Sequence, residues 1–414
     1  MGELTMTRFP LTLGRFPGTG EEYAYDGDES LITVARPGRG KSQALVVRNL
    51  LRLEGPAIVL DVKPELYKLT AGWRSRNGRP VVYFRPTDIL KSAHFNPLDL
   101  VPVNKFEAPR VIKQLVRLLM VPKDQKSADT FWESRAAQYV AAAMADIALN
   151  AKRERRNMTS VVEWLSPTSE EALKEQAERL QDSGVLALRV VGAELARLKG
   201  SVRESLLATA MQHIQMWGEP EVEGLTDYTS WSFDDLRRRN GTLYLCVTPE
   251  ELKEYASLIR IILGRALQEF RESSGPQVTF FVDEFPQLGY MPELMRMLEL
   301  GRGAGCRLWL FTQTLGQIDE QYGTALRQAI FDMCSIQSFI EPTGDLARFI
   351  EKQLPPQTNP YTGQSKPMAT AHELAGPEYQ GKVIVLEGGR SPALLNRVFA
   401  FDDRQLTGRI NMPV

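Results

Sequence analysis

The chain has 414 residues, of which 43% are hydrophobic and 24% are charged, an ordinary balance for a soluble globular protein. Its 50 lysines and arginines against 51 aspartates and glutamates give a formal net charge of −1. This balance excludes a global positive charge as the basis for binding nucleic acid, so any such contact needs a local patch or a pore formed by several subunits. The three cysteines form no C-x-x-C pair and the three histidines are far apart, so the sequence predicts no metal site built from these residues.

The chain begins with two expected edge strands, at Leu11–Leu13 and Glu22–Tyr25, and then reaches a strand, a glycine-bearing loop and a helix start. Leu31–Val34 is apolar and predicts a buried strand, and Lys41 and Ser42 open an apolar-periodic helix. This order is typical of a loop whose backbone N–H groups bind a polyphosphate at a helix N-terminus. The predicted phosphate loop comprises Ala35, Arg36, Pro37, Gly38, Arg39, Gly40, Lys41 and Ser42.

Within this loop, Lys41 would reach the terminal phosphates of ATP, and the Ser42 hydroxyl would hold Mg²⁺. Ala35 stands where the consensus G-x-x-x-x-G-K-[ST] has its first glycine, which we interpret as a mild defect of the loop entry. Taken alone, the stretch is also compatible with an ordinary strand-to-helix turn that exposes a lysine.

The next segment predicts a parallel sheet. A strand at Pro56–Asp61, a helix near Leu69–Arg76 and a strand at Val81–Phe84 have the spacing of βαβ units. A turn at Phe95–Asp99 follows.

Strand signals then disappear, and residues 103–236 are predicted to form an all-α domain inserted between residues 1–102 and 237–414. The expected helices are Phe106–Met120, Thr130–Asn150, Ser169–Gln181, Val185–Lys199 and Ser201–Trp217. Asp129 or Thr130 would cap the second helix, and Ser169 suits the first turn of the third.

The α/β pattern returns after residue 237 and continues to the C-terminal region. The expected strands are Thr242–Val247, Val278–Glu284, Arg307–Gln313, Ser335–Ile340, Val383–Leu386 and Val398–Phe401. The expected helices are Glu250–Glu272, Pro292–Gly301 and Gly344–Gln353, and Pro355–Pro367 is expected to be a loop. The fold class predicted from this order is α/β, with a mostly parallel sheet flanked by helices.

Two carboxylates end the strand that begins at Val278, and such strand ends meet ligands at the carboxyl edge of a parallel sheet. Asp283 would share Mg²⁺ with Ser42, and Glu284 would act as a base toward the attacking water. Gln313 would sense the γ-phosphate from the next strand, although a polar strand end without function is an equal alternative. We interpret Arg302 either as a solvated turn residue or as an arginine finger that acts on the neighbouring subunit.

The order of these motifs resembles the type IV secretion coupling proteins, the TraG/TraD family of conjugative DNA-transfer ATPases. The similar segments are Ala35–Ser42, Leu60–Ala71, Phe95–Asp99, Asp129–Glu133 and Val282–Phe285, with Arg302, Gln313, Gln317 and Tyr322-Gly323 in matching order. The resemblance implies a RecA-like P-loop NTPase, with residues 1–102 and 237–414 as the nucleotide-binding domain and residues 103–236 as the all-α domain. It also implies homo-hexameric rings with ATP and Mg²⁺ between subunits, although a monomer in isolation would remain compatible with a ring on DNA.

The implied activity is ATP hydrolysis that recruits and translocates DNA, through a central pore, or protein substrates such as a relaxase or an effector. The family's usual N-terminal membrane anchor is not seen in the sequence, so we expect a cytoplasmic protein, or one held at the inner membrane by an anchor or channel subunit. Two alternatives stay open: a nucleotide-gated recruitment module with little hydrolysis, and a cytosolic DNA translocase unrelated to export. Two basic runs, at Lys152–Arg156 and Arg237–Arg239, are candidate DNA contacts, although such runs are usually solvated faces.

Overall fold

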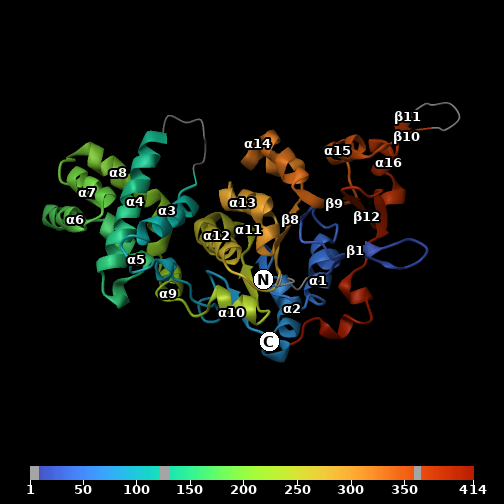
Figure 1. Cartoon of the computed structure of the whole chain (residues 1–414), viewed down its shortest axis with the longest axis horizontal. Coiled ribbons are helices and arrows are strands. Elements are labelled where there is room, and N and C mark those ends of the chain that lie inside the picture. The colour runs from blue at the N-terminus through green and yellow to red at the C-terminus, as the bar shows by residue number, and fades with distance from the viewer. Residues whose placement is uncertain (1–8, 122–129, 359–364) are drawn as a thin grey trace, which may run out of the picture. The chain divides into compact units, whose positions relative to one another are not determined.

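The computed structural model describes residues 9–121, 130–358 and 365–414, and these form two compact units (Figure 1). The first unit takes in the chain up to Tyr83, Phe233–Pro249 and Ala266–Val414, and the second takes in Phe84–Ser232 and Glu250–Arg265. The second unit is therefore wider than the all-α segment 103–236 expected from the sequence. The boundaries of the functional domains stay a prediction.

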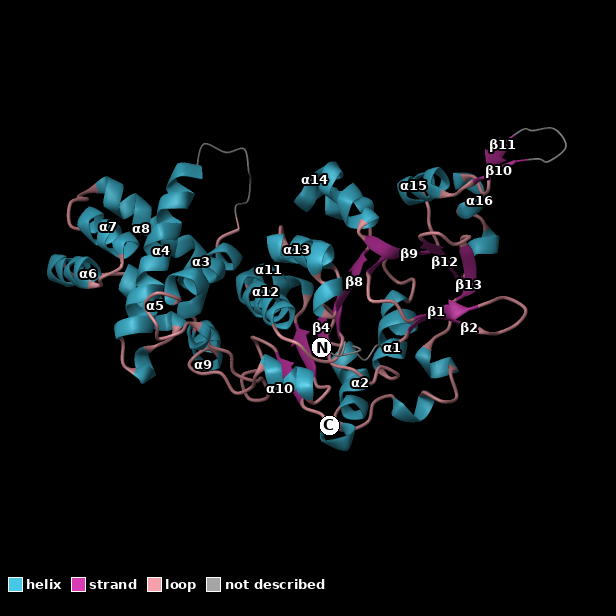
Figure 2. Ribbon diagram, in the orientation of Figure 1, coloured by secondary structure: helices cyan, strands magenta, loops and turns pink. Residues whose placement is uncertain are grey.

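One large mixed sheet forms the centre of the first unit (Figure 2). Its strands are β1 Leu11–Arg15, β2 Glu22–Tyr25, β3 Ser30–Ala35, β4 Ala57–Asp61, β5 Val81–Phe84, β6 Thr242–Cys246, β7 Val278–Val282, β8 Cys306–Thr312, β9 Cys334–Ile340, β12 Lys382–Glu387 and β13 Ala393–Asn396. Across the sheet the order is β2-β1-β13-β12-β9-β3-β8-β7-β4-β6-β5. The strands from β9 to β6 pair in parallel, whereas β12, β13, β1 and β2 form an antiparallel wing.

The parallel strands β3, β4, β6, β7 and β8 are buried along their whole length, which explains why they are mostly apolar in sequence. On one face, Trp309 and Phe281 pack beneath the helix that follows β3 and beneath α2. On the other face, Phe280 of β7 contacts Phe270 of α12 with ring centroids 6.0 Å apart. Both faces are thus covered by helices, as a doubly wound α/β sheet requires.

The helix after β3 begins as a π-helix at Ser42–Val47 and ends as α1 Arg48–Leu50. The other helices of the first unit are α2 Leu66–Arg74, α10 Phe233–Arg238, α13 Pro292–Leu300, α14 Leu315–Asp332, α15 Asp345–Gln353 and α16 Ala371–Leu374. A two-stranded sheet, β10 Pro356–Thr358 with β11 Ser365–Pro367, completes the unit.

The second unit is helical. It contains α3 Ala108–Leu119, α4 Thr130–Asn150, α5 Met158–Leu165, α6 Glu170–Asp182, α7 Leu186–Leu195, α8 Ser201–Ile214, α9 Pro220–Leu225, α11 Pro249–Glu254 and the first part of α12 Ala256–Glu272. Its interior holds Asp146, which accepts a hydrogen bond from Trp164 Nε1 at 2.8 Å and pairs with Arg179 at 3.1 Å. Ser169 caps α6 by accepting from the N–H of Ala172, as expected.

The fold-class prediction is confirmed, because the structure has a large, mostly parallel sheet flanked by helices. No helix among the described residues is long and apolar enough to span a bilayer. The expected cap at Asp129 or Thr130 falls where the side chains are not described.

Three expected elements are wrong. The strand expected at Val398–Phe401 lies instead at β13, where Leu395 is buried and pairs with Val383. The single helix expected over Glu250–Glu272 is two helices that meet at Tyr255, which is itself buried and so does not interrupt the apolar pattern. The ends of the Pro355–Pro367 loop pair as β10 and β11, and residues 359–364 lie outside the described part.

Candidate functional site

The predicted site residues meet at the carboxyl edge of the parallel strands. Lys41 follows β3, Gln313 follows β8, and Asp283 and Glu284 follow β7. In the sheet, β8 lies between β3 and β7. Asp283 and Glu284 therefore follow a strand that is two positions away from β3, the strand that leads into the phosphate loop. The sequence correctly indicates that Gln313 ends a strand next to β7.

The loop after β3 needs glycine at two positions. Gly38 and Gly40 have φ values of +74° and +71°, a region that L-residues rarely adopt. Ala35, by contrast, is the last residue of β3 and pairs with Ile340, so its backbone is extended and a side chain is accommodated without strain. Alanine at the first consensus position is therefore compatible with the loop geometry.

Lys41 lies against both carboxylates of the predicted site. Its Nζ is 3.1 Å from Asp283 Oδ1 and also contacts Glu284 Oε1 as an ion pair. All three side chains are almost fully buried, with exposed fractions of 11% or less. One cation thus faces two buried carboxylates, a combination that calls for a further positive group or a protonated acid.

Glu284 has a raised carboxyl pKa and a left-handed backbone conformation. Burial raises the pKa of its carboxyl group, and the neighbouring Asp283 adds to the effect, whereas Lys41 and the Gln313 amide oppose it. The residue has φ +49°, a left-handed conformation that costs a non-glycine residue about 1 kcal/mol or more. Strain and a raised carboxyl pKa at the end of a strand are features of functional acids.

Gln313 is fixed by the cap of the helix that follows it. Thr314 is the N-cap of α14, and Gln317 completes a capping box with it. Gln317 Oε1 also accepts a hydrogen bond from the Gln313 backbone N–H at 3.1 Å. The backbone that carries the Gln313 amide is therefore held beside Glu284.

Asp61, at the end of β4, is a further buried acid near this edge. It accepts hydrogen bonds from the backbone N–H groups of Glu65 and Tyr67, at 3.2 and 2.9 Å, and so holds the start of α2. Burial raises its pKa to about 6, with a contribution from Asp283. We assign Asp61 a structural role at the helix start.

Two residues that the sequence analysis does not single out contact the loop. Glu341 follows β9 and lies 2.7 Å from Arg39, and Arg397 lies 3.1 Å from Glu341 while it donates to the Arg39 carbonyl. Glu341 has φ +48°, so it is strained in the same way as Glu284. The sequence carried a signal for Glu341, because it is a carboxylate at the end of a strand, like Asp61 and Asp283.

Arg302 is not brought to this group of residues. It lies before β8, at the amino edge of the sheet, where it pairs with Asp28 at 3.2 Å and Glu29 at 3.0 Å. Its side chain is 66% exposed. Since the loop lies at the opposite, carboxyl edge, Arg302 does not contact the loop of its own chain.

Three arginines of the two basic runs, Arg155, Arg156 and Arg237, already have partners within the chain. Arg237 is buried and donates to backbone carbonyls, among them that of Phe270 at 2.7 Å. Arg155 pairs with Glu163, and Arg156 donates to the carbonyls of Leu98 and Val101. Arg156 and Arg237 hold backbone carbonyls in place, so these two are poor candidates for contacts with DNA.

The group of residues fits a phosphate and a divalent cation held jointly. Glu284 Oε2 is buried and accepts no hydrogen bond from the described residues, which leaves an acceptor available for water. No cluster of three or more Asp, Glu, His or Cys side chains among the described residues is arranged to hold a metal on its own. A cation at Asp283 would therefore share its coordination with phosphate oxygens and water, as Mg²⁺ commonly does.

Comparison with known proteins identifies the family and the fold. Residues 11–375 match the family model described as type IV secretory system conjugative DNA transfer. Protein VirD4 of Rhizobium radiobacter is 25% identical over 93% of this chain and 59% of its own length. The conjugal transfer protein TraG of Escherichia coli is 24% identical over 77% of this chain and 53% of its own length, so the chain spans little more than half of these relatives.

Among solved structures, the bacterial conjugative coupling protein TrwBdeltaN70, in an unbound form, is similar over 98% of this chain and 97% of its own. The TM-score is 0.70 and the identity is 15%. The plasmid coupling protein TrwB in complex with a non-hydrolysable ATP analogue gives a TM-score of 0.72 over 96% of each chain, at 16% identity. These likenesses show a shared fold.

Proposed function

The chain belongs to the type IV secretory system conjugative DNA transfer family, and on this basis we propose that it is an ATP-hydrolysing coupling protein that recruits and moves DNA, or protein bound to DNA. The observation that carries the proposal is the contact of Lys41 with Asp283 and Glu284 behind a loop whose two glycines have positive φ. A lysine that already faces two buried carboxylates is positioned to exchange them for phosphate oxygens.

Each residue of the site has a proposed role. Lys41 would bind the terminal phosphates, and its departure from Glu284 would free that carboxylate to accept a proton from water. The Ser42 hydroxyl and Asp283 would hold Mg²⁺, which supplies positive charge against the phosphates. The Gln313 amide would orient the water, and the backbone N–H groups of residues 35–42 would bind the remaining phosphate oxygens.

We propose that the assembly is a homo-hexamer with ATP sites between subunits and DNA in a central pore. The position of Arg302 at the amino edge supports a role at a neighbouring subunit's site, since it lies away from the loop of its own chain. The proposed further partners are a relaxase or effector substrate and a secretion-channel or membrane-anchor subunit. The latter would hold the protein at the cytoplasmic face of the inner membrane.

An experiment on mixed subunits tests Arg302. Arg302→Ala and Lys41→Ala should each remove most ATP hydrolysis, because each disables every interface in a uniform ring. An equal mixture should recover about one quarter of the wild-type rate, because that share of random interfaces joins an intact Lys41 to an intact Arg302. Steady-state phosphate release measures the recovery.

As a control, subunits that carry different tags are used to confirm that mixed rings form. If mixed rings form and activity does not return at any ratio, the assignment of Arg302 to a neighbouring site is wrong. Arg348→Ala, which removes another exposed and ion-paired arginine of the same unit, should leave hydrolysis unchanged.

The function as a whole is tested by steady-state ATP hydrolysis with and without single- and double-stranded DNA, over a range of protein concentrations. We expect DNA to stimulate turnover, and turnover to rise more than linearly with protein concentration as rings assemble. Tight ATP binding with negligible turnover under every condition would favour the nucleotide-gated recruitment module instead. DNA-stimulated turnover without affinity for any secretion subunit would favour a cytosolic translocase.

A further inference from the structure

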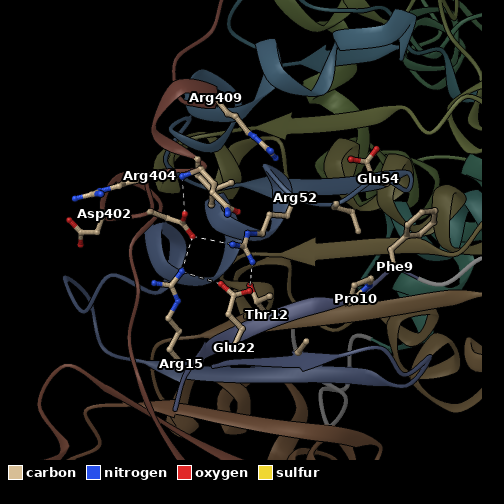
Figure 3. A pocket seen from close by; sticks show the side chains of 15 residues that line it. Phe9, Pro10, Thr12, Arg15, Glu22, Arg52, Glu54, Asp402, Arg404 and Arg409 are labelled. Carbon is tan, nitrogen blue, oxygen red and sulfur yellow. Dashed lines mark hydrogen bonds and ion pairs between the residues drawn. The ribbon is translucent and has the colours of Figure 1, made fainter. Parts of the chain in front are cut away.

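The C-terminal segment Arg397–Arg409 lies along the helix that follows the phosphate loop. Its anchor is Asp403, which is 4% exposed and faces Arg15, Arg48 and Arg52 at 3.3, 3.5 and 3.1 Å. Figure 3 shows Arg15, Glu22 and Arg52 gathered beside this segment. These three arginines surround Asp403 and Glu22 in a partly buried network that fixes the segment on the helix.

The other end of the segment reaches the loop itself. A Cβ built on Gly40 would lie 2.5 Å from Phe399 Cε1, so the ring of Phe399 rests directly on the glycine backbone. Arg397 donates to the Arg39 carbonyl and pairs with Glu341. The segment is therefore attached at the loop and at the helix, and the residues between these attachments have defined positions.

Between the attachments lies a small aromatic stack. The rings of Phe399 and Phe401 have centroids 5.1 Å apart and an interplanar angle of 8°, and the Arg397 guanidinium carbon lies 5.1 Å from the Phe399 centroid. Phe401 is 55% exposed, although a phenylalanine gains most from burial. An exposed aromatic face is thus held one ring away from a glycine of the phosphate loop.

We propose that Phe401 is the stacking platform for the base of the nucleotide whose phosphates occupy the loop, and that Phe399 positions it. This inference rests on the proposed function, since it assumes nucleotide at Lys41. A nucleoside attached to phosphates in the loop must lie next to the loop, where this face is available. Stacking on an aromatic ring stabilises any base, because every base has a π-face. We therefore expect adenine and guanine nucleotides to bind with similar affinity.

Calorimetric titration of the full chain with two probes tests the platform: a non-hydrolysable ATP analogue and inorganic tripolyphosphate, each with Mg²⁺. Phe401→Ala should raise the Kd of the analogue about tenfold, the size expected for loss of one base–aromatic stack. The Kd of tripolyphosphate, which has no base, should stay unchanged. Phe401→Tyr keeps the ring and should restore the affinity of the analogue.

The matched control is Phe106→Ala, which removes another exposed phenylalanine, 84% exposed, from the second unit. It should leave both Kd values unchanged. If Phe401→Ala weakens both ligands equally, the ring shapes the loop and the platform is wrong, and unchanged binding of the analogue would also exclude it. Failure of the unaltered chain to bind either ligand would overturn the proposed function, and the platform with it.

Discussion

Replacing Glu284 by glutamine is expected to lower the turnover number for ATP by a factor of about 10² to 10⁴, the usual contribution of a general base. The amide keeps the shape of the side chain but cannot accept a proton from water. Binding of ATP should persist, because Lys41 and the loop backbone are untouched, so the variant should hold ATP without hydrolysing it. Single-turnover phosphate release beside equilibrium binding measures the two effects separately.

The dependence of ATP turnover on pH tests the role of Glu284 in a second way. Burial raises the pKa of Glu284, and only the ionised carboxylate can act as a base. Turnover should therefore rise with pH on the acidic side, with an inflection above the ordinary range for glutamate, and Glu284→Gln should lose this limb. The measurement is the pH dependence of kcat/KM, which reports the unliganded protein, over the range in which the protein stays folded.

Glu299→Gln is the matched control, since Glu299 is an exposed glutamate of α13 in the same unit, and it should change neither quantity. If Glu284→Gln hydrolyses ATP at a rate within a few-fold of wild type, Glu284 is not the general base. Loss of ATP binding together with turnover would instead point to a structural role for its contact with Lys41.

The candidate site was largely predictable from the sequence because its parts are local. Gly-Lys-Ser follows one predicted strand, and two carboxylates follow another. Each short pattern therefore places its functional residues at the end of a strand. In a parallel sheet all such ends lie on one edge. The sequence thus indicated that Lys41, Asp283 and Gln313 would share an edge, but not that β8 separates β3 from β7, because strand order depends on long-range packing.

The same reasoning explains what was missed. Glu341 and Arg397 brace Arg39 only because β9 neighbours β3 and because the C-terminal segment returns to the loop. The strand expected at Val398–Phe401 was wrong for a related reason. Its apolar alternation reflects Phe399 against the loop and Phe401 in a stack, rather than burial in a sheet. Hydrophobic periodicity reports that a residue has apolar contacts, and does not report with which element.

Replacing Lys41 by alanine is expected to weaken ATP binding about 10- to 100-fold, the range expected for loss of one charge-assisted hydrogen bond to phosphate. The substitution also removes the cation that faces Asp283 and Glu284. Because two buried carboxylates then lose their partner, the thermal midpoint of the unliganded protein should fall as well. Titration calorimetry with a non-hydrolysable ATP analogue and thermal unfolding without ligand measure the two effects.

The two effects can be separated by a second substitution. Adding Glu284→Gln to Lys41→Ala removes one buried negative charge and should restore part of the thermal midpoint, whereas the affinity for the analogue should stay low. Lys68→Ala, at an exposed lysine on α2, should alter neither. If the double variant regained full affinity, the weak binding of Lys41→Ala would arise from repulsion between the carboxylates and the phosphates. Lys41 would then act by neutralising Asp283 and Glu284 rather than by binding phosphate itself.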